Sequence, residues 1–477
     1  MAILAAYAVP HPPLIIPAVG RGEERGIQKT VDAYEEVARR VAAHAPDTIV
    51  ISTPHTTLYR DYFHISPGVH AAGSFAAFRA AHASYEANYD DEFVRVLSQL
   101  CCESGIAAGS DYEREPALDH ATMIPLHFIQ QHLSDFKLVR IGLSGFDAAE
   151  HYRIGMAIQQ AAEQLKRRLV YIASGDLSHK LKDDGPYGFV PEGPILDEQI
   201  CSALSSGNFL SLLSIDPSLA ERGAECGLRS FQMMAGALDG TCVTSELLSY
   251  EGPFGVGYAV AAFEPTEKPQ PDDSRRYLDA YYEHQQIKLQ RIREQEDAYV
   301  RLARASLESY VQTGRRIVAA DVLDGLVTAE DNSAIADLLT TQAGCFVSLN
   351  KDGQLRGCIG TIEPTRESLA AEICANAISA GTQDPRFAPL NLSELDQLVY
   401  DVDVLGQPEA ISSPAELNPK QYGVIVSSPD GRRGLLLPDL DGVESVEEQL
   451  SIAAQKAGIN LERDEWSLER FEVVRHL

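Results

Sequence analysis

The sequence predicts two domains, a larger α/β domain followed by a smaller α+β domain, and three observations support this. The chain has 477 residues, enough for two or three domains of roughly 150 residues each. Short apolar runs alternate with amphipathic stretches up to residue 264, as in a sheet with parallel strands. Beyond a proline-rich, charged stretch at 263–276, strands and helices are segregated along the chain.

The first domain, 1–264, contains the elements of a parallel sheet with flanking helices. The strand candidates are short apolar runs at 4–9, 48–53, 137–144, 168–174 and 257–263. Three stretches have the hydrophobic spacing of amphipathic helices: 26–44, 91–104 and 149–169. Because ligands of such sheets bind beyond the carboxyl ends of the strands, we expect the functional site where these loops meet.

The second domain, 294–477, follows a linker and the start of a connecting helix at 265–293. A polar helix is predicted over 276–313, ending at the glycine of QTGRR. The later elements are a hairpin of 345–350 and 355–362 around Lys351-Asp352-Gly353, a helix ending at Gly381, a strand at 398–405, and a hairpin of GVIVSS with GLLLP. This order predicts an α+β domain.

Composition and charge exclude several classes of partner. The chain carries 40 basic and 69 acidic residues, a net charge of −29, which repels phosphate backbones and anionic lipids, so neither nucleic acid nor a membrane is expected as a partner. No apolar run reaches the roughly 18–20 residues of a membrane span. The N-terminal stretch has no basic leader and is not typical of a signal peptide. The eight scattered cysteines, without a CxxC motif, indicate the reducing cytoplasm.

Histidines gather in the first domain, where eleven of the thirteen lie before residue 180. Three loops place one just after a strand candidate or before a helix: His11 follows 4–9, His55 follows 48–53, and His120 precedes a predicted helix. A fourth, ASGDLSHK, places Asp176 and His179 after 168–174. Parallel strand ends converge on one crevice, so these side chains are expected to meet.

Two imidazoles and one carboxylate on one face of a metal ion form the site of non-haem Fe(II) oxygenases. The carboxylate candidates are Asp176, Asp119 and Glu225. Glu225 heads an apolar helix, where a carboxylate is electrostatically favoured. The next residue is Cys226, whose thiolate would favour softer metals such as Cu(I) or Zn. A small buried structural cysteine is the alternative for Cys226.

Residues 1–264 resemble the class III extradiol dioxygenases, the LigB superfamily that includes the Memo proteins. The segments VPHPPL, HTTLYRDYF, DHATMIPL and SGDLSH carry the resemblance. It implies that His11, His55 and Glu225 hold Fe(II). In Memo-type members the third ligand is a cysteine, which makes Cys226 the alternative and Zn or Cu alternative metals.

The resemblance also implies an activity, the opening of a catechol-type aromatic diol by O₂. His179 would then act as the acid–base group, and His120 would lie beside the bound substrate or oxygen. Two other functions remain open on the same ligands: a non-catalytic Memo-type metal-binding module, and a metal-dependent hydrolase or modifying enzyme.

The C-terminal part is similar to the AMMECR family over roughly 295–470. LRGCIGTIEP, ANAISAGTQDPRFAPL and LVYDVDVL carry this resemblance, which implies a fold and little more. Arg356 and Arg386 are donors suited to a carboxylate or phosphate. Cys358 is expected to be a buried structural cysteine, with a reactive thiol as the alternative, since reactivity requires a lowered pKa.

The fusion of the two families suggests partners. Memo-type and AMMECR-type proteins are associated with a radical-SAM protein in a proposed three-part modification system. The chain lacks a CxxxCxxC cluster motif, so a radical-SAM partner would be a separate protein. The acidic surface is compatible with a symmetric homo-oligomer.

Overall fold

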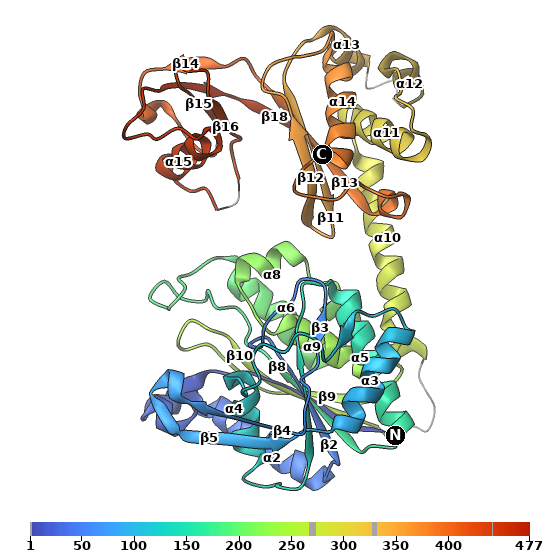
Figure 1. Ribbon diagram of the computed structural model, residues 1–477, viewed down its shortest axis with the longest axis vertical. Coiled ribbons are helices and arrows are strands. Elements are labelled where there is room, and N and C mark those ends of the chain that lie inside the picture. Colours follow the sequence, from blue (N-terminus) through green and yellow to red (C-terminus); the bar gives the residue numbers. More distant parts are fainter. Residues whose placement is uncertain (1, 267–272, 327–331, 441) are drawn as a thin grey trace. The chain divides into compact units, whose positions relative to one another are not determined.

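The computed structural model describes residues 2–266, 273–326, 332–440 and 442–477 (Figure 1). The chain divides into two compact units, Met1–His284 and Gln285–Leu477. The first is an α/β unit and the second contains segregated strands and helices, which confirms the predicted fold classes. Of the predicted linker, residues 267–272 lie outside the described residues. No helix within the described ranges is long and apolar enough to cross a membrane.

A six-stranded sheet forms the centre of the first unit. Its order is β7-β2-β8-β1-β10-β9, and the first four strands are parallel while β10 and β9 are antiparallel to their neighbours. The strands are β1 Ile3–Val9, β2 Thr48–Thr53, β7 Lys137–Gly142, β8 Leu169–Ser174, β9 Val243–Glu251 and β10 Tyr258–Pro265. All five predicted strands are present. The edge strand β9 was not predicted, because its exposed polar residues interrupt the apolar pattern.

Helices cover both faces of this sheet (Figure 1). One face packs on α2 Gln28–His44, α4 His120–Ile129 and the hairpin β4 His70–Phe75 with β5 Ala80–Asn88. The other face packs on α3 Asp91–Glu103, α5 Ala148–Leu165, α6 Glu192–Ser206, α7 Phe209–Leu213 and α9 Leu228–Ala237. Shorter elements are α1 Pro17–Gly20, β3 Phe63–His64, β6 Ala108–Gly109 and α8 Pro217–Gly223. The strands β2 and β8 are buried at every residue between these layers, and β1, β7 and β10 are buried along most of their length, as their apolar sequences require.

The connecting stretch contains two helices where one was predicted. They are α10 Tyr277–Gln295 and α11 Ala298–Thr313. The prediction of one helix over 276–313 is wrong because Asp297 has an extended backbone and its carboxylate accepts hydrogen bonds from the backbone N–H groups of Tyr299 and Val300. This N-cap begins a new helix. The predicted end is correct, since Gly314 closes α11 in the left-handed conformation with φ 72°.

Two four-stranded antiparallel sheets form the rest of the second unit, in the orders β12-β11-β13-β18 and β14-β17-β15-β16. The first sheet packs one face on α11 and α14 Leu369–Thr382, and the second packs on α15 Val446–Ala457. Both predicted hairpins form, β11 Cys345–Lys351 with β12 Gln354–Gly360 and β15 Gly423–Ser427 with β16 Arg433–Leu436. The other elements are α12 Ala319–Leu326, α13 Asn332–Thr340, β13 Leu398–Leu405, β14 Glu409–Ile411, β17 Ser467–Phe471 and β18 Val473–His476.

Candidate metal centre

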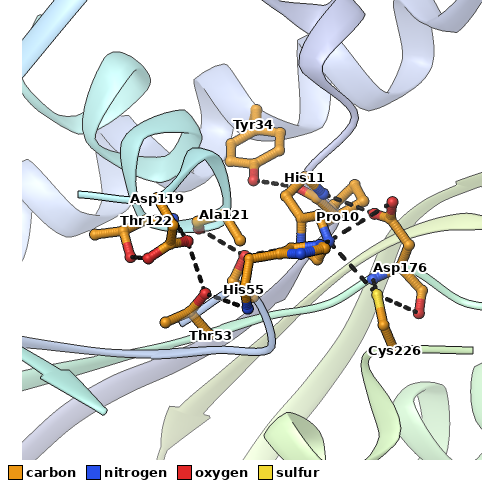
Figure 2. Close-up of polar contacts among 11 residues, drawn as sticks. Pro10, His11, Tyr34, Thr53, His55, Asp119, Ala121, Thr122, Asp176 and Cys226 are labelled. Atoms are coloured by element: carbon orange, nitrogen blue, oxygen red, sulfur yellow. Dashed lines mark hydrogen bonds and ion pairs between the residues drawn. The ribbon is translucent and has the colours of Figure 1, made fainter. Parts of the chain in front are cut away.

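The candidate site lies beyond the carboxyl ends of three neighbouring strands, β1, β8 and β2. His11 follows β1, His55 follows β2, and Asp176 and His179 follow β8. Because β8 lies between β1 and β2 in the sheet, loops that are far apart in the sequence lie side by side (Figure 2). The predicted convergence of these side chains is therefore present in the fold.

Potential ligand atoms approach each other closely at this point. The Nε2 atoms of His11 and His55 lie 3.0 Å apart, and the thiol sulfur of Cys226 lies 3.5 Å from His11 Nε2. His11, His55 and Cys226 form one group of potential ligands whose atoms all lie within 4.8 Å of one another. Asp176, His179 and Cys226 form a second such group, so Cys226 belongs to both.

The surroundings of His11 set its tautomer. The side chain is buried, and its Nδ1 lies 3.1 Å from the hydroxyl oxygen of Ser174. That hydroxyl donates its own proton to the carbonyl oxygen of Ala121 at 2.7 Å, so it accepts a hydrogen bond from Nδ1–H of His11. The Nε2 atom is then left unprotonated and faces His55 and Cys226, which is the state of a metal ligand.

Asp119 serves a structural purpose in this site. Its carboxylate caps α4, accepting hydrogen bonds from the backbone N–H of Thr122 at 3.0 Å and from the hydroxyl of Thr53 at 2.8 Å. The Thr53 hydroxyl in turn accepts a hydrogen bond from the backbone N–H of His55 at 3.2 Å. Asp119 belongs to neither group of potential ligands and instead ties the His55 loop to α4.

The histidines of the site are held in their neutral form. Burial lowers the pKa of His11 well below its usual value, and it also lowers the pKa of His55 and of His179. His120, the first residue of α4, has its ring centroid 4.1 Å from that of His55. Burial, followed by the charge of His55, lowers the pKa of His120 to about 4. Neutral imidazoles bind metal ions and accept protons, as the proposed roles of these residues require.

Asp176 and His179 form the other side of the crevice. The Asp176 carboxylate accepts a hydrogen bond from the backbone N–H of His11 at 2.7 Å, and burial raises its pKa to about 7. The ring of His179 stacks on Tyr187, with centroids 5.3 Å apart. Tyr187 is largely exposed and His179 is half-buried, so this side of the crevice is open to solvent.

The structure brings Cys226, and not Glu225, next to His11. The Glu225 carboxylate accepts a hydrogen bond from the backbone N–H of Leu228, the first residue of α9, and belongs to neither group of potential ligands. The helix N-terminus that suggested Glu225 as a ligand therefore engages its carboxylate itself. The geometry favours the alternative third ligand, the thiol of Cys226.

Two glycines set the position of Cys226. A Cβ atom on Gly175 would lie 2.1 Å from the Cα atom of Gly227, so the two backbones pass closer than any side chain allows. This contact brings the Cys226 sulfur within 3.4 Å of the backbone N–H of Asp176, which donates to it. Sequence reasoning missed Ser174 and Gly175 as residues that orient the ligands. The pattern Ser-Gly-Asp directly after an apolar run was the available indication.

In the second unit, each of the two arginines predicted as anion donors pairs with a carboxylate. Arg356 binds the Glu394 carboxylate, at 2.8 and 3.2 Å, and Arg386 binds the Asp384 carboxylate at 2.6 and 2.9 Å. Cys358 is only partly buried, because it faces away from the core side of β12. The expectation of a buried structural cysteine is therefore not met at Cys358.

The distances from His11 Nε2 to the other two donor atoms fit bonds to one metal ion, and the donor atoms of His55 and Cys226 lie within 4.8 Å of each other. Metal bonds of about 2.05 Å to nitrogen and 2.3 Å to sulfur place tetrahedral N and N donors about 3.3 Å apart and N and S donors about 3.6 Å apart. The corresponding distances are 3.0 and 3.5 Å. Two imidazole nitrogens and a thiol already lie close together, on a buried His11, a half-buried Cys226 and an exposed His55, and they form a ligand set for a transition-metal ion.

The fold and the site define the class of the first unit. It is an α/β domain whose histidine-rich crevice, beyond the strand ends, contains side chains that could hold a metal ion. Residues 5–261 match the family model described as the catalytic LigB subunit of aromatic ring-opening dioxygenase, and residues 300–476 match AMMECR1. The chain belongs to the LigB family and carries a C-terminal AMMECR1 domain.

Relatives share the same organisation or one part of it. Protein CA_C1420 of Clostridium acetobutylicum is 41% identical over 486 residues, covering 100% of this chain and 99% of the relative. A Thermotoga maritima protein is 51% identical over 168 residues, which cover 35% of this chain and 96% of that protein. The crystal structure of uncharacterized protein PH0010 from Pyrococcus horikoshii covers 38% of this chain and 90% of its own, at 31% identity and a TM-score of 0.33.

Proposed function

We propose that the N-terminal domain is a metal-dependent oxygenase that opens a catechol-type aromatic diol with O₂. The observation that carries this is the approach of His11 Nε2, His55 Nε2 and the Cys226 sulfur beyond three strand ends of a LigB-family fold. The tautomer of His11 supports it, because Ser174 leaves Nε2 free to bind a metal ion.

An Fe(II) ion held by these three residues would supply the activation of O₂. The chain's own groups supply binding and proton transfer. His179, half-buried beside Asp176 and Cys226, takes a proton from a substrate hydroxyl on its neutral imidazole and later returns it. His120 lies against His55 and offers a hydrogen bond to the substrate on the ligand side. In the net reaction one ring C–C bond breaks and both atoms of O₂ enter the product.

One observation favours a second function. The thiol of Cys226 lies 3.5 Å from His11 Nε2, whereas Fe(II) oxygenases of this ligand type use a carboxylate as the third ligand. A thiol ligand fits a Memo-type metal-binding module that binds Cu(I) or Zn and does not open aromatic rings. In that case the domain would work with its own AMMECR1 domain and a separate radical-SAM protein in a modification system.

Catechol-dependent oxygen consumption separates the two functions. The protein is loaded anaerobically with Fe(II), and O₂ uptake and the absorbance of ring-opened product are followed after addition of a catechol. The oxygenase predicts uptake that is lost in His11→Ala and reduced about 10²–10⁴-fold in His179→Ala, the range of general acid–base catalysis. Tyr85→Phe, a change outside the crevice, serves as the control. Iron that binds fully without any catechol-dependent uptake would refute ring opening and support the module.

A further inference from the structure

Cys358 lies on the face of the β12-β11-β13-β18 sheet that is opposite α11 and α14. Its neighbour Gly357 faces α14, because a Cβ atom there would lie 2.3 Å from the carbonyl oxygen of Ala380. Side chains alternate along a strand, so Cys358 points to the opposite face. It is partly buried there, beside its cross-strand partner Ser348.

Cys358 makes hydrogen bonds with three polar residues, Ser348, Asp384 and Arg386. The Ser348 hydroxyl donates a hydrogen bond to the sulfur, with Oγ and Sγ 3.3 Å apart. The backbone N–H of Cys358 donates to the Asp384 carboxylate at 2.9 Å, and its carbonyl accepts from the Arg386 guanidinium at 3.1 Å. The sulfur therefore has a hydroxyl donor on it, and a guanidinium is bound to the backbone carbonyl of the same residue.

The nearby charges leave a positive balance at the sulfur. Asp384 is the acidic group in contact with the Cys358 backbone, and Arg386 binds it at 2.6 Å and holds its pKa well below the usual range. A second cation, Lys456 of α15, interacts electrostatically with both Cys358 and Arg386. Arg386, Asp384 and Cys358 thus lie together at a partly open position, and Lys456 is near enough to act on them electrostatically.

The two cations also act against each other. Burial lowers the pKa of Lys456, Cys358 opposes this shift, and the charge of Arg386 lowers the pKa further. A negatively charged group bound between them would relieve this repulsion. The side chain of Arg386 is 53% exposed, so an anion can reach it from solvent.

The other cysteines of this domain have different surroundings. Cys345 and Cys374 lie in its apolar core, and burial raises their pKa to about 12 and about 11. Such thiols are unreactive. Cys358 is the one of these three that combines partial exposure with cationic neighbours.

We propose that Cys358 is a reactive thiol in an anion-binding position of the AMMECR1 domain, and that it takes up electrophiles that carry negative charge, anionic disulfides in particular. The Cys358 thiolate attacks one sulfur of the disulfide. A new bond forms from Sγ to that sulfur, the original S–S bond breaks, and the other half leaves as a thiolate with the electron pair. The disulfide is the oxidant, so no further reagent is needed.

Labelling kinetics on the full chain test this. The probes are the dianionic aromatic disulfide DTNB and the neutral disulfide dithiodipyridine, and mass spectrometry of peptides assigns the labelled cysteine. The internal reference is Cys102, an exposed thiol on α3. We expect DTNB to react with Cys358 about tenfold faster than with Cys102 at low salt. A few cation–anion contacts near water are expected to raise the rate by about this factor. In about 1 M salt, the ratio of the Cys358 rate to the Cys102 rate with DTNB should fall toward the ratio measured with dithiodipyridine.

Two charge variants complete the test. Lys456→Gln should lower the ratio of the DTNB rate to the neutral-probe rate at Cys358 several-fold, whereas Arg386→Lys, which keeps the charge, should largely preserve it. Lys420→Gln, which removes an exposed charge that pairs with Glu444, is the matched control and should leave the ratio unchanged. Cys358 labelling no faster than Cys102 labelling, or an equal ratio in Lys456→Gln and Lys420→Gln, would overturn the proposal.

Discussion

The substitution Gly175→Ala tests how the backbone positions the candidate metal ligands. Gly175 follows β8, and its backbone N–H donates to the carbonyl oxygen of Val9 at 2.9 Å, which holds it against β1. The Cβ atom of an alanine would lie 2.1 Å from the Cα atom of Gly227. Since Gly175 is tied to the sheet, the segment with Cys226 and Gly227 is expected to move.

The size of the movement follows from these distances. Ordinary van der Waals contact begins at 3.4 Å, so Gly227 must retreat by the difference from 2.1 Å, about 1.3 Å. If the Cys226 sulfur moves by the same amount directly away from His11, its distance from Nε2 rises from 3.5 Å to about 4.8 Å. Metal bonds of about 2.05 and 2.3 Å reach across at most about 4.4 Å, so one ion could not contact both atoms.

Metal affinity is the property to measure, by competition with a chromophoric chelator. Gly175→Ala should weaken binding about 10–100-fold, the usual effect of displacing a group that positions a ligand. Overpacking should also lower the free energy of unfolding of the first unit by about 1–3 kcal/mol. Gly325→Ala, whose added Cβ atom meets nothing within 4 Å, is the control. Wild-type affinity in Gly175→Ala would refute the argument that this contact holds the third ligand.

Three further substitutions test separate features. Ser174→Ala removes the acceptor of His11 Nδ1–H, so titration calorimetry should show metal affinity about 10–100-fold lower. Burial raises the pKa of Asp197 to about 6, above the roughly 3.9 of an unfolded aspartate. Stability should therefore fall by up to about 3 kcal/mol as pH rises from about 4 to 6, and urea unfolding of Asp197→Asn should lack this loss. Asp297→Ala removes the N-cap of α11 and should cost about 1 kcal/mol in thermal unfolding of the second unit.

The fold was predictable where the apolar pattern was strong. The five runs at 4–9, 48–53, 137–144, 168–174 and 257–263 are strands because their residues must be buried. The pattern was weaker in two places. The edge strand β9 is half exposed and polar, and the helices α10 and α11 have polar surfaces that hide the break at Asp297. There the deciding factor is a single capping carboxylate and not periodicity.

The candidate site was predictable to the level of loops. His11, His55 and His179 converge because parallel strands end at one edge of the sheet. The choice between Glu225 and Cys226 was not predictable, because the two are adjacent in the sequence. A rotation of the chain by one residue before α9 decides which side chain faces the crevice, and the close contact of two glycine backbones sets that rotation.

The central claim is that His11, His55 and Cys226 together hold one metal ion, and metal content per chain after anaerobic reconstitution tests it most directly. The wild type and Glu225→Gln should each retain about one ion per chain, as a mononuclear site of three protein ligands requires. His11→Ala and Cys226→Ser should lose it. Full metal content in Cys226→Ser together with its loss in Glu225→Gln would contradict the claim and return the third ligand to the carboxylate.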